Sequence, residues 1–176
     1  SAAFPGQNSL FGISGTQTNA LIFGGDGTGS SIATAFSYDG TAFSTSPSLG
    51  TARRQVGGFG HTTTTAVCVC GQNPPALSNV EEYDGSSWSE VNNMPVARIK
   101  PFASGTLTAG LAGGGESGPT PASQDSAAEY DGTNWTATPA IPAACLDATS
   151  LGTQTASLVC VGVPGTAVLY YNGSTW

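Results

Sequence analysis

The sequence has 176 residues, of which 39% are hydrophobic, only 9% are charged and 25 residues are glycine. Because Lys, Glu and Arg are scarce, the chain has little material for amphipathic helices, and its short, regularly spaced apolar runs favour β-strands. Four Lys and Arg against eleven Asp and Glu give a net charge of −7. This charge excludes the basic stripe of a nucleic-acid-binding protein and disfavours binding to an anionic membrane surface. No apolar run approaches the roughly 20 residues of a membrane span, so we expect no membrane insertion.

A short motif recurs four times along the chain. It consists of Tyr, then Asp or Asn, then Gly, then two variable residues, then Trp or Phe, at intervals of 41 to 47 residues. Asp-Gly between two β-prone segments is a strong hairpin signal, and aromatic side chains on paired strands can pack together. We therefore predict that the first and last residues of the motif occupy equivalent positions in four structural units: Tyr38, Tyr83, Tyr130 and Tyr171, and Phe43, Trp88, Trp135 and Trp176.

A glycine with the same period marks a second position in each unit. It lies at Gly15, Gly60, Gly105 and Gly152, and each copy precedes a polar turn, mostly rich in Thr, and then a short, mainly apolar run. Each unit thus reads as four short strands, and a unit of this size cannot bury its faces unless neighbours stack on it. We predict an all-β fold, a β-propeller with four blades of four antiparallel strands, about 16 strands in total and almost no helix. The blade boundaries are expected at about 1–45, 46–90, 91–137 and 138–176.

These landmarks resemble kelch repeats, which carry Gly-Gly after an apolar strand, then Tyr, Trp and an Arg before the next unit. Arg53 and Arg98 each lie ten positions after the motif's last aromatic residue, whereas Cys145 takes this place in the third unit. Segments 81–88 and 152–156 are similar to the kelch-like repeats of marine phage virion proteins, including tail and fibre components. The resemblance implies a structural or host-contacting part of a virus particle, in a tail or surface appendage or outside the cell. Its partners would be other virion proteins or a host-surface glycan or protein.

No sequence motif indicates a catalytic centre, a metal site or a cofactor. The Asp-Gly-x-x-Trp motif is similar to the Asp-box of sialidase-like propellers but lacks the residue between Asp and Gly. Such enzymes also need several arginines for a carboxylate substrate, and only Arg53, Arg54 and Arg98 exist. His61, the one histidine, has no recognisable catalytic partner and is interpreted as a solvated turn residue. We expect a non-enzymatic module; the alternative is an extracellular glycan-binding or glycan-active propeller.

The four cysteines are interpreted as buried free thiols, with a disulfide or a metal site as alternatives. Cys68 and Cys70 lie two positions apart in one apolar run, so we expect them to share a face of the strand.

The loops of such a unit alternate between two rims of the propeller. The Thr-rich and Asp-Gly turns share one rim and are nearly uniform, whereas the loops between the second and third strands share the other rim and vary in length. Variable loops on a rigid repeat are the usual place for recognition. We therefore predict binding residues on the variable rim: Asp26, Thr28, Gln72, Asn73, Glu116, Gln124 and Asp125.

The sequence is compatible with two arrangements of the first and last blades. By the period of the repeat, the chain spans four whole units, so no blade is completed by strands from both ends. The first solution is a closed four-bladed ring sealed by side-chain packing between the first and last blades. We favour it because an open array would expose two apolar faces. In the second, the chain belongs to a longer array, or meets other copies in a larger ring as a homo-oligomer. Uncovered apolar faces on both terminal blades would argue against the closed ring.

Overall fold

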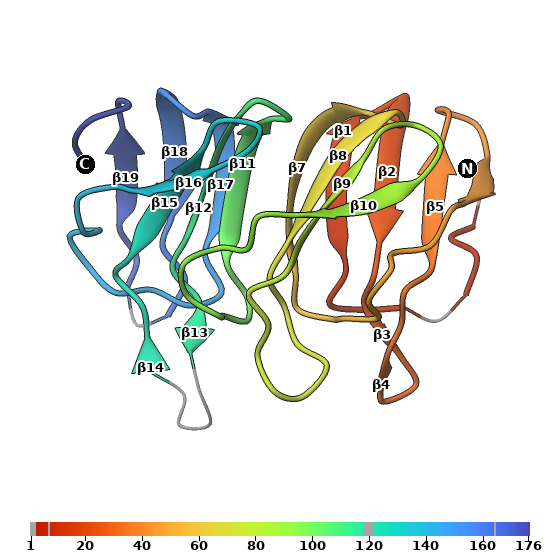
Figure 1. Cartoon of the computed structure of the whole chain (residues 1–176), viewed down its shortest axis with the longest axis horizontal. Helices are drawn as coiled ribbons and strands as arrows, with labels where there is room; N and C mark the ends of the chain where they lie inside the picture. The colour runs from red at the N-terminus through yellow and green to blue at the C-terminus, as the bar shows by residue number, and fades with distance from the viewer. Residues whose placement is uncertain (1–2, 7, 118–121, 164) are drawn as a thin grey trace.

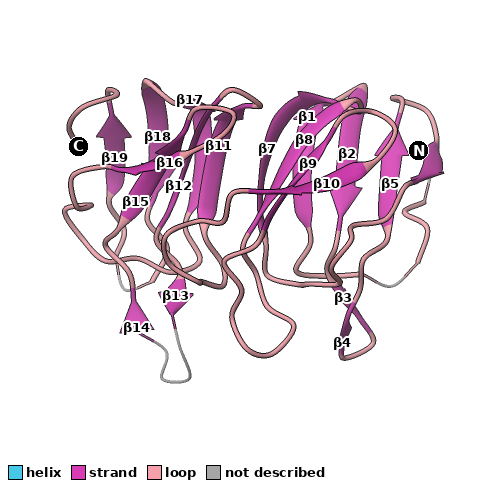
Figure 2. Ribbon diagram, viewed as in Figure 1, coloured by secondary structure: helices cyan, strands magenta, loops and turns pink. Residues whose placement is uncertain are grey.

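The computed structural model describes residues 3–6, 8–117, 122–163 and 165–176. Every regular element in this part of the chain is a β-strand, and four small antiparallel sheets are set around a common axis as the blades of a four-bladed β-propeller (Figures 1 and 2). The all-β propeller predicted from the repeat is therefore confirmed.

Each blade is formed by consecutive strands that pair with antiparallel neighbours. Blade 1 contains β1 (Gly12–Thr16), β2 (Asn19–Phe23), β5 (Ala35–Tyr38) and β6 (Phe43–Ser46). Blade 2 contains β7 (Gly57–Thr62), β8 (Thr65–Val69), β9 (Val80–Tyr83) and β10 (Trp88–Val91). Blade 3 contains β11 (Phe102–Thr106), β12 (Ala109–Gly113), β15 (Ala127–Tyr130) and β16 (Trp135–Ala137). Blade 4 contains β17 (Thr149–Thr153), β18 (Ala156–Cys160) and β19 (Val168–Tyr171). The innermost strands are β1, β7, β11 and β17.

The strand count differs from the expected 16 in two ways. Two short hairpins are added between the second and third strands of blades 1 and 3: β3 (Asp26–Gly27) with β4 (Ser30–Ser31), and β13 (Glu116–Ser117) with β14 (Ala122–Ser123). Blade 4 forms three strands instead of four. In the other blades the fourth strand begins at the aromatic residue of the motif, and the corresponding residue here, Trp176, is the last of the sequence.

Stacking of neighbouring blades buries the apolar second strands. In β8, the side chains of Ala66 and Cys68 pack against blade 1, and those of Val67 and Val69 pack against blade 3. Because both faces of this strand are covered, its sequence is almost continuously apolar instead of alternating. Among the described residues this stacking produces three core clusters, one between each pair of successive blades.

The equivalence of the repeated aromatic residues is confirmed. In each unit the Tyr and the Trp or Phe pack against each other across the Asp-Gly or Asn-Gly turn, with tilted rings whose centroids lie 4.7, 5.2, 4.8 and 4.8 Å apart in blades 1 to 4. The turn between them is also repeated. Asp39 Oδ1 accepts hydrogen bonds from the backbone N–H groups of Thr41 and Ala42, both at 2.8 Å. Gly40 has a φ of 96°, a conformation that glycine adopts cheaply.

These turn carboxylates predict an acid-dependent loss of stability. The hydroxyl and N–H donors of the turn lower the pKa of Asp39 from 3.8 to about 2, and they lower that of Asp84 in the same way. The pKa of Asp131 is lowered by the N–H donors of Asn134 and Thr133. Because the pKa in the folded state lies below that in the unfolded state, the stabilisation is present above about pH 4 and is lost as the pH falls towards about 2.

Asn172 in the fourth turn makes the same N–H contacts, at 2.9 and 2.8 Å, with an amide that does not titrate. The triple Asn variant of the three aspartates should therefore keep its fold at pH 7 and lose much of the decline in melting temperature between pH 4 and pH 2. An unchanged decline would show that other groups cause it.

The prediction for the two neighbouring cysteines is wrong in one respect. Cys68 faces blade 1, whereas Cys70 belongs to the core between blades 2 and 3. Cys70 follows the end of β8 and has a φ of 56°, so the backbone turns there and breaks the alternation of the strand. As expected, all four cysteines are free thiols, and three are buried. Burial raises the pKa of Cys68 to about 11 and that of Cys70 to about 12, so these thiols are unreactive at neutral pH.

The expected sealing of the ring between the first and last blades is wrong. Close contacts join β1 to β7, β7 to β11 and β11 to β17, whereas β17 and β1 share few if any. Large apolar side chains at this boundary are exposed instead, among them Ile13 at 56% and Leu151 at 61%. The two chain ends lie at opposite ends of the longest axis of the molecule (Figure 1). The propeller therefore has one open seam, between blades 4 and 1.

Candidate functional site

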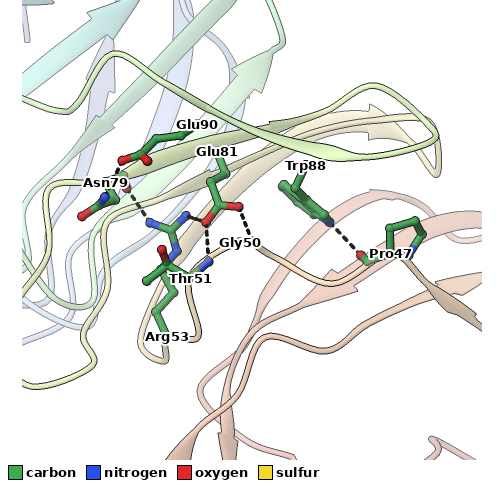
Figure 3. Close-up of polar contacts among 8 residues, drawn as sticks. All are labelled: Pro47, Gly50, Thr51, Arg53, Asn79, Glu81, Trp88 and Glu90. Carbon is green, nitrogen blue, oxygen red and sulfur yellow. Dashed lines mark hydrogen bonds and ion pairs between the residues drawn. The ribbon is translucent and has the colours of Figure 1, made fainter.

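The arginine that recurs in the sequence is a buried structural group. The Arg53 side chain is fully buried; its Nη2 lies 2.5 Å from Glu81 Oε1 and its Nη1 donates to the carbonyl of Asn79 at 2.7 Å. Glu81 also accepts the N–H groups of Gly50 at 2.6 Å and Thr51 at 3.2 Å (Figure 3). Arg53 thus ties the connection between blades 1 and 2 to the third strand of blade 2.

Arg98 occupies the equivalent place in the next blade without a carboxylate partner. Its Nη1 donates to the carbonyls of Gly114 and Ser126 at 2.8 and 2.9 Å, and its Nη2 donates to Ser126 Oγ at 3.0 Å. Burial lowers the pKa of this guanidinium. Cys145 fills the same position in the connection between blades 3 and 4. Its backbone N–H donates to the carbonyl of Gln124, just as the N–H groups of Arg53 and Arg98 donate to carbonyls of the loops that precede them.

Only two cationic side chains are left for the surface, and both lie on the variable rim. Arg54 pairs with Asp26 at 2.6 Å. Lys100 lies between Glu116 at 3.1 Å and Asp147 at 3.3 Å. All five charged groups in these pairs come from loops or short hairpins, so this rim differs in charge from blade to blade.

The predicted binding residues lie on the loops that project from this rim. The β3–β4 hairpin, the loop after β8 and the β13–β14 hairpin all project from the same side of the propeller (Figure 1). Arg54 brings Asp26 and Gln72 together, because it pairs with the Asp26 carboxylate and exchanges two backbone hydrogen bonds with Gln72 at 3.0 and 2.8 Å. The seven residues are exposed or half-buried: Asp26, Gln72, Glu116 and Gln124 are half-buried, and Thr28, Asn73 and Asp125 are exposed.

A ring of four residues that sequence reasoning missed surrounds the mouth of the central channel on this rim. Leu10, Gln55, Lys100 and Asp147 immediately precede or approach the innermost strands and have φ values of 58, 56, 55 and 53°. Together they line one depression. The N–H of Gln55 donates to the carbonyl of Leu10 at 2.7 Å, and that of Lys100 to Gln55 at 2.8 Å. A left-handed conformation at residues other than glycine is strained, and such positions concentrate at functional sites.

Most of the residues that line the channel are small, although Ile13, Phe59 and Leu151 also contribute to its wall. A cavity of about 300 Å³ along it is bounded by all four innermost strands, with residues such as Gly58, Ala103 and Ser150 in its wall. The ionisable side chains along the channel lie at its two mouths: His61 on the uniform rim, and Lys100 and Asp147 on the variable rim. His61 is exposed, as expected, but it lies in β7, at the register shift between Gly60 and Thr62, and not in the turn itself.

Two further findings concern the described residues only. They contain no group of three His, Cys, Asp or Glu side chains close enough to hold a metal ion. They also contain no helix of the length and apolarity that crossing a membrane requires.

The fold defines the class of this protein as a four-bladed β-propeller with antiparallel blades. Neither a scan of the sequence against models of protein families nor a search of curated proteins gives a match.

Proposed function

We propose that this chain is a non-enzymatic recognition module of the kelch-like repeat type, and that its variable rim contacts a neighbouring subunit or a host surface. The observation that carries the proposal is the division of polar groups between the two rims. The repeated carboxylates of Asp39, Asp84 and Asp131 are used by their own turns. Charged groups that differ between blades, together with the projecting loops, are gathered on the other rim.

The equivalent positions of the channel mouth support a binding role. One backbone position carries Leu10, Gln55, Lys100 and Asp147 in the four units, with nearly the same φ in each. A position that only served the fold would favour one residue type, above all glycine. An apolar, an amide, a basic and an acidic side chain around one mouth instead form a chemically asymmetric surface, which is suited to recognising one partner in one orientation.

The resemblance to kelch-like repeats of marine phage virion proteins gives the proposal its setting. In that setting the chain is a tail or fibre component of a virion, with virion proteins or host-surface molecules as partners. A glycan is one chemical class of host ligand for the same rim, and a glycan-binding propeller is the alternative form of this function.

Binding of the labelled chain to intact bacterial cells tests the proposal. We expect saturable binding that falls about tenfold or more in a variant carrying Asp26→Ala, Asn73→Ala and Asp125→Ala, since loss of a few central contacts commonly removes a large part of an interface's binding energy. The matched control is His61→Ala on the opposite rim, which should bind like the natural chain. Periodate treatment of the cells distinguishes a glycan receptor from a protein receptor. Equal binding by the rim variant and the natural chain would refute the assignment of the site.

A further inference from the structure

One face of each blade repeats the same apolar contact with the blade that follows. Leu21, Val67 and Leu111 lie at equivalent positions, next to the residue paired with the motif Tyr, and each is fully buried under the following blade. Leu158 is the fourth member of this set. It is only half-buried, because no blade covers it.

The uncovered face of blade 4 is apolar across all three of its strands. Leu151, Leu158 and Tyr170 pair directly across β17, β18 and β19, so their side chains form one row on this face. Cys160 and Val168 form part of the next row. Leu151, Val168 and Tyr170 are exposed to 61, 48 and 71%. A soluble chain rarely leaves a contiguous apolar row of this kind uncovered unless it is an interaction surface.

The opposite end of the array is covered by the chain itself. Phe4 packs on the outer face of blade 1, with ring centroids 5.8, 5.6 and 5.3 Å from those of Phe11, Phe36 and Phe43. The Tyr38 hydroxyl donates within its own turn, to the carbonyl of Gly40. Blade 1 therefore has the features of a capping repeat, and the array has one capped end and one open end.

The contacts between the blades define what fits the open face. The indole N–H groups of Trp88, Trp135 and Trp176 donate to carbonyls of the preceding blade at 3.0, 3.0 and 2.9 Å, whereas blade 1 has Phe43, which has no N–H donor in its side chain, at this position. The hydroxyls of Tyr130 and Tyr171 likewise donate to glutamates of the preceding blade, at 2.7 and 3.1 Å. Each incoming blade places a small residue beside this Tyr: Ala66, Gly110 or Ser157.

We propose that the exposed face of blade 4, formed by Leu151, Leu158, Cys160, Val168 and Tyr170, is a docking surface for a further β-blade of this repeat type. The incoming blade presents a strand of small residues, a Tyr and a Trp. Leu158 then packs under the incoming blade as Leu111 packs under blade 4. Tyr170 replaces the glutamate of blades 2 and 3, and its hydroxyl can accept the hydrogen bond that the hydroxyl of the incoming Tyr donates.

Cys160 provides a reporter for this contact. It lies on the open face, whereas Cys68 and Cys70 are fully buried in the core and serve as internal controls. The test protein is the whole chain with a copy of residues 89–135 appended after Trp176. Since Trp88 and Trp176 are equivalent and this segment contains no cysteine, it adds one unit in register without a new thiol.

We expect alkylation of Cys160 by a short pulse of iodoacetamide, read by mass spectrometry, to slow about tenfold or more in the extended chain, because covered sites react only after local opening. The matched control carries Ala112→Lys in the appended copy, which places a charge on its docking face and should restore the natural rate.

Two results would overturn the proposal. One is equal alkylation of Cys160 in the natural and extended chains when circular dichroism shows that the added unit is folded. The other is a natural chain that light scattering shows to be a dimer with Cys160 already protected, because the open face would then be covered by a second copy.

Discussion

Glu81→Ala is expected to lower the free energy of unfolding by about 3–5 kcal/mol, because it leaves the buried Arg53 guanidinium without its counter-charge. The side chains of Arg53 and Glu81 are exposed to only 0 and 4%, so water cannot replace the lost carboxylate. The same change also removes the acceptor for the N–H groups of Gly50 and Thr51. Urea unfolding followed by tryptophan fluorescence measures the effect.

Glu90→Ala is the matched control for this experiment. Glu90 pairs directly with Glu81 in the β9–β10 ladder, but its side chain is exposed and bonds only Asn79, so its loss should cost within about 0.5 kcal/mol. The double variant Arg53→Leu with Glu81→Leu should be more stable than Glu81→Ala alone, since replacing both partners leaves no unpaired charge. A Glu81→Ala variant as stable as Glu90→Ala would show that Arg53 finds other partners.

The regular part of the fold was predictable because it depends on spacing. Turn chemistry and aromatic pairing act over a few residues, so a motif from Tyr83 to Trp88 specifies a hairpin wherever it occurs. Repetition of that motif then specifies stacking, because each blade has two apolar faces to bury. The pairing of strands within each blade follows from the hairpin motif and from its repetition.

The rim and the ends could not be predicted in the same way. The left-handed conformations at Gln55 and Lys100 have no sequence signal, since the residue types differ and none is glycine. The pairing of Arg54 with Asp26 joins residues from different units. The cap formed by Phe4 likewise depends on a single residue outside the repeat pattern. Such contacts are not periodic, and they are the features that distinguish this propeller from others with the same repeat.

The glycine that precedes each polar turn predicts a second large effect. Gly105 has a φ of 123°, and a Cβ there would lie 2.3 Å from the carbonyl oxygen of Ala109 and 2.8 Å from the Cα of Gly110. Both are backbone atoms, so the tight β11–β12 turn would have to open. We expect Gly105→Ala to cost about 3 kcal/mol or more, the sum of backbone strain and steric overlap.

Gly29→Ala separates those two causes. Gly29 has a similar φ of 93°, but a Cβ at this position would meet nothing within 4 Å. Its replacement should therefore cost about 1 kcal/mol, from backbone strain alone. Urea midpoints of both variants give the comparison. If Gly105→Ala costs no more than Gly29→Ala, the repeated glycine is required only for its backbone conformation. If it costs more, the close approach of the first and second strands of each blade is the reason that all four blades place glycine at this position, since a Cβ at Gly15, Gly60 or Gly152 would also lie 2.1 to 2.4 Å from a carbonyl oxygen.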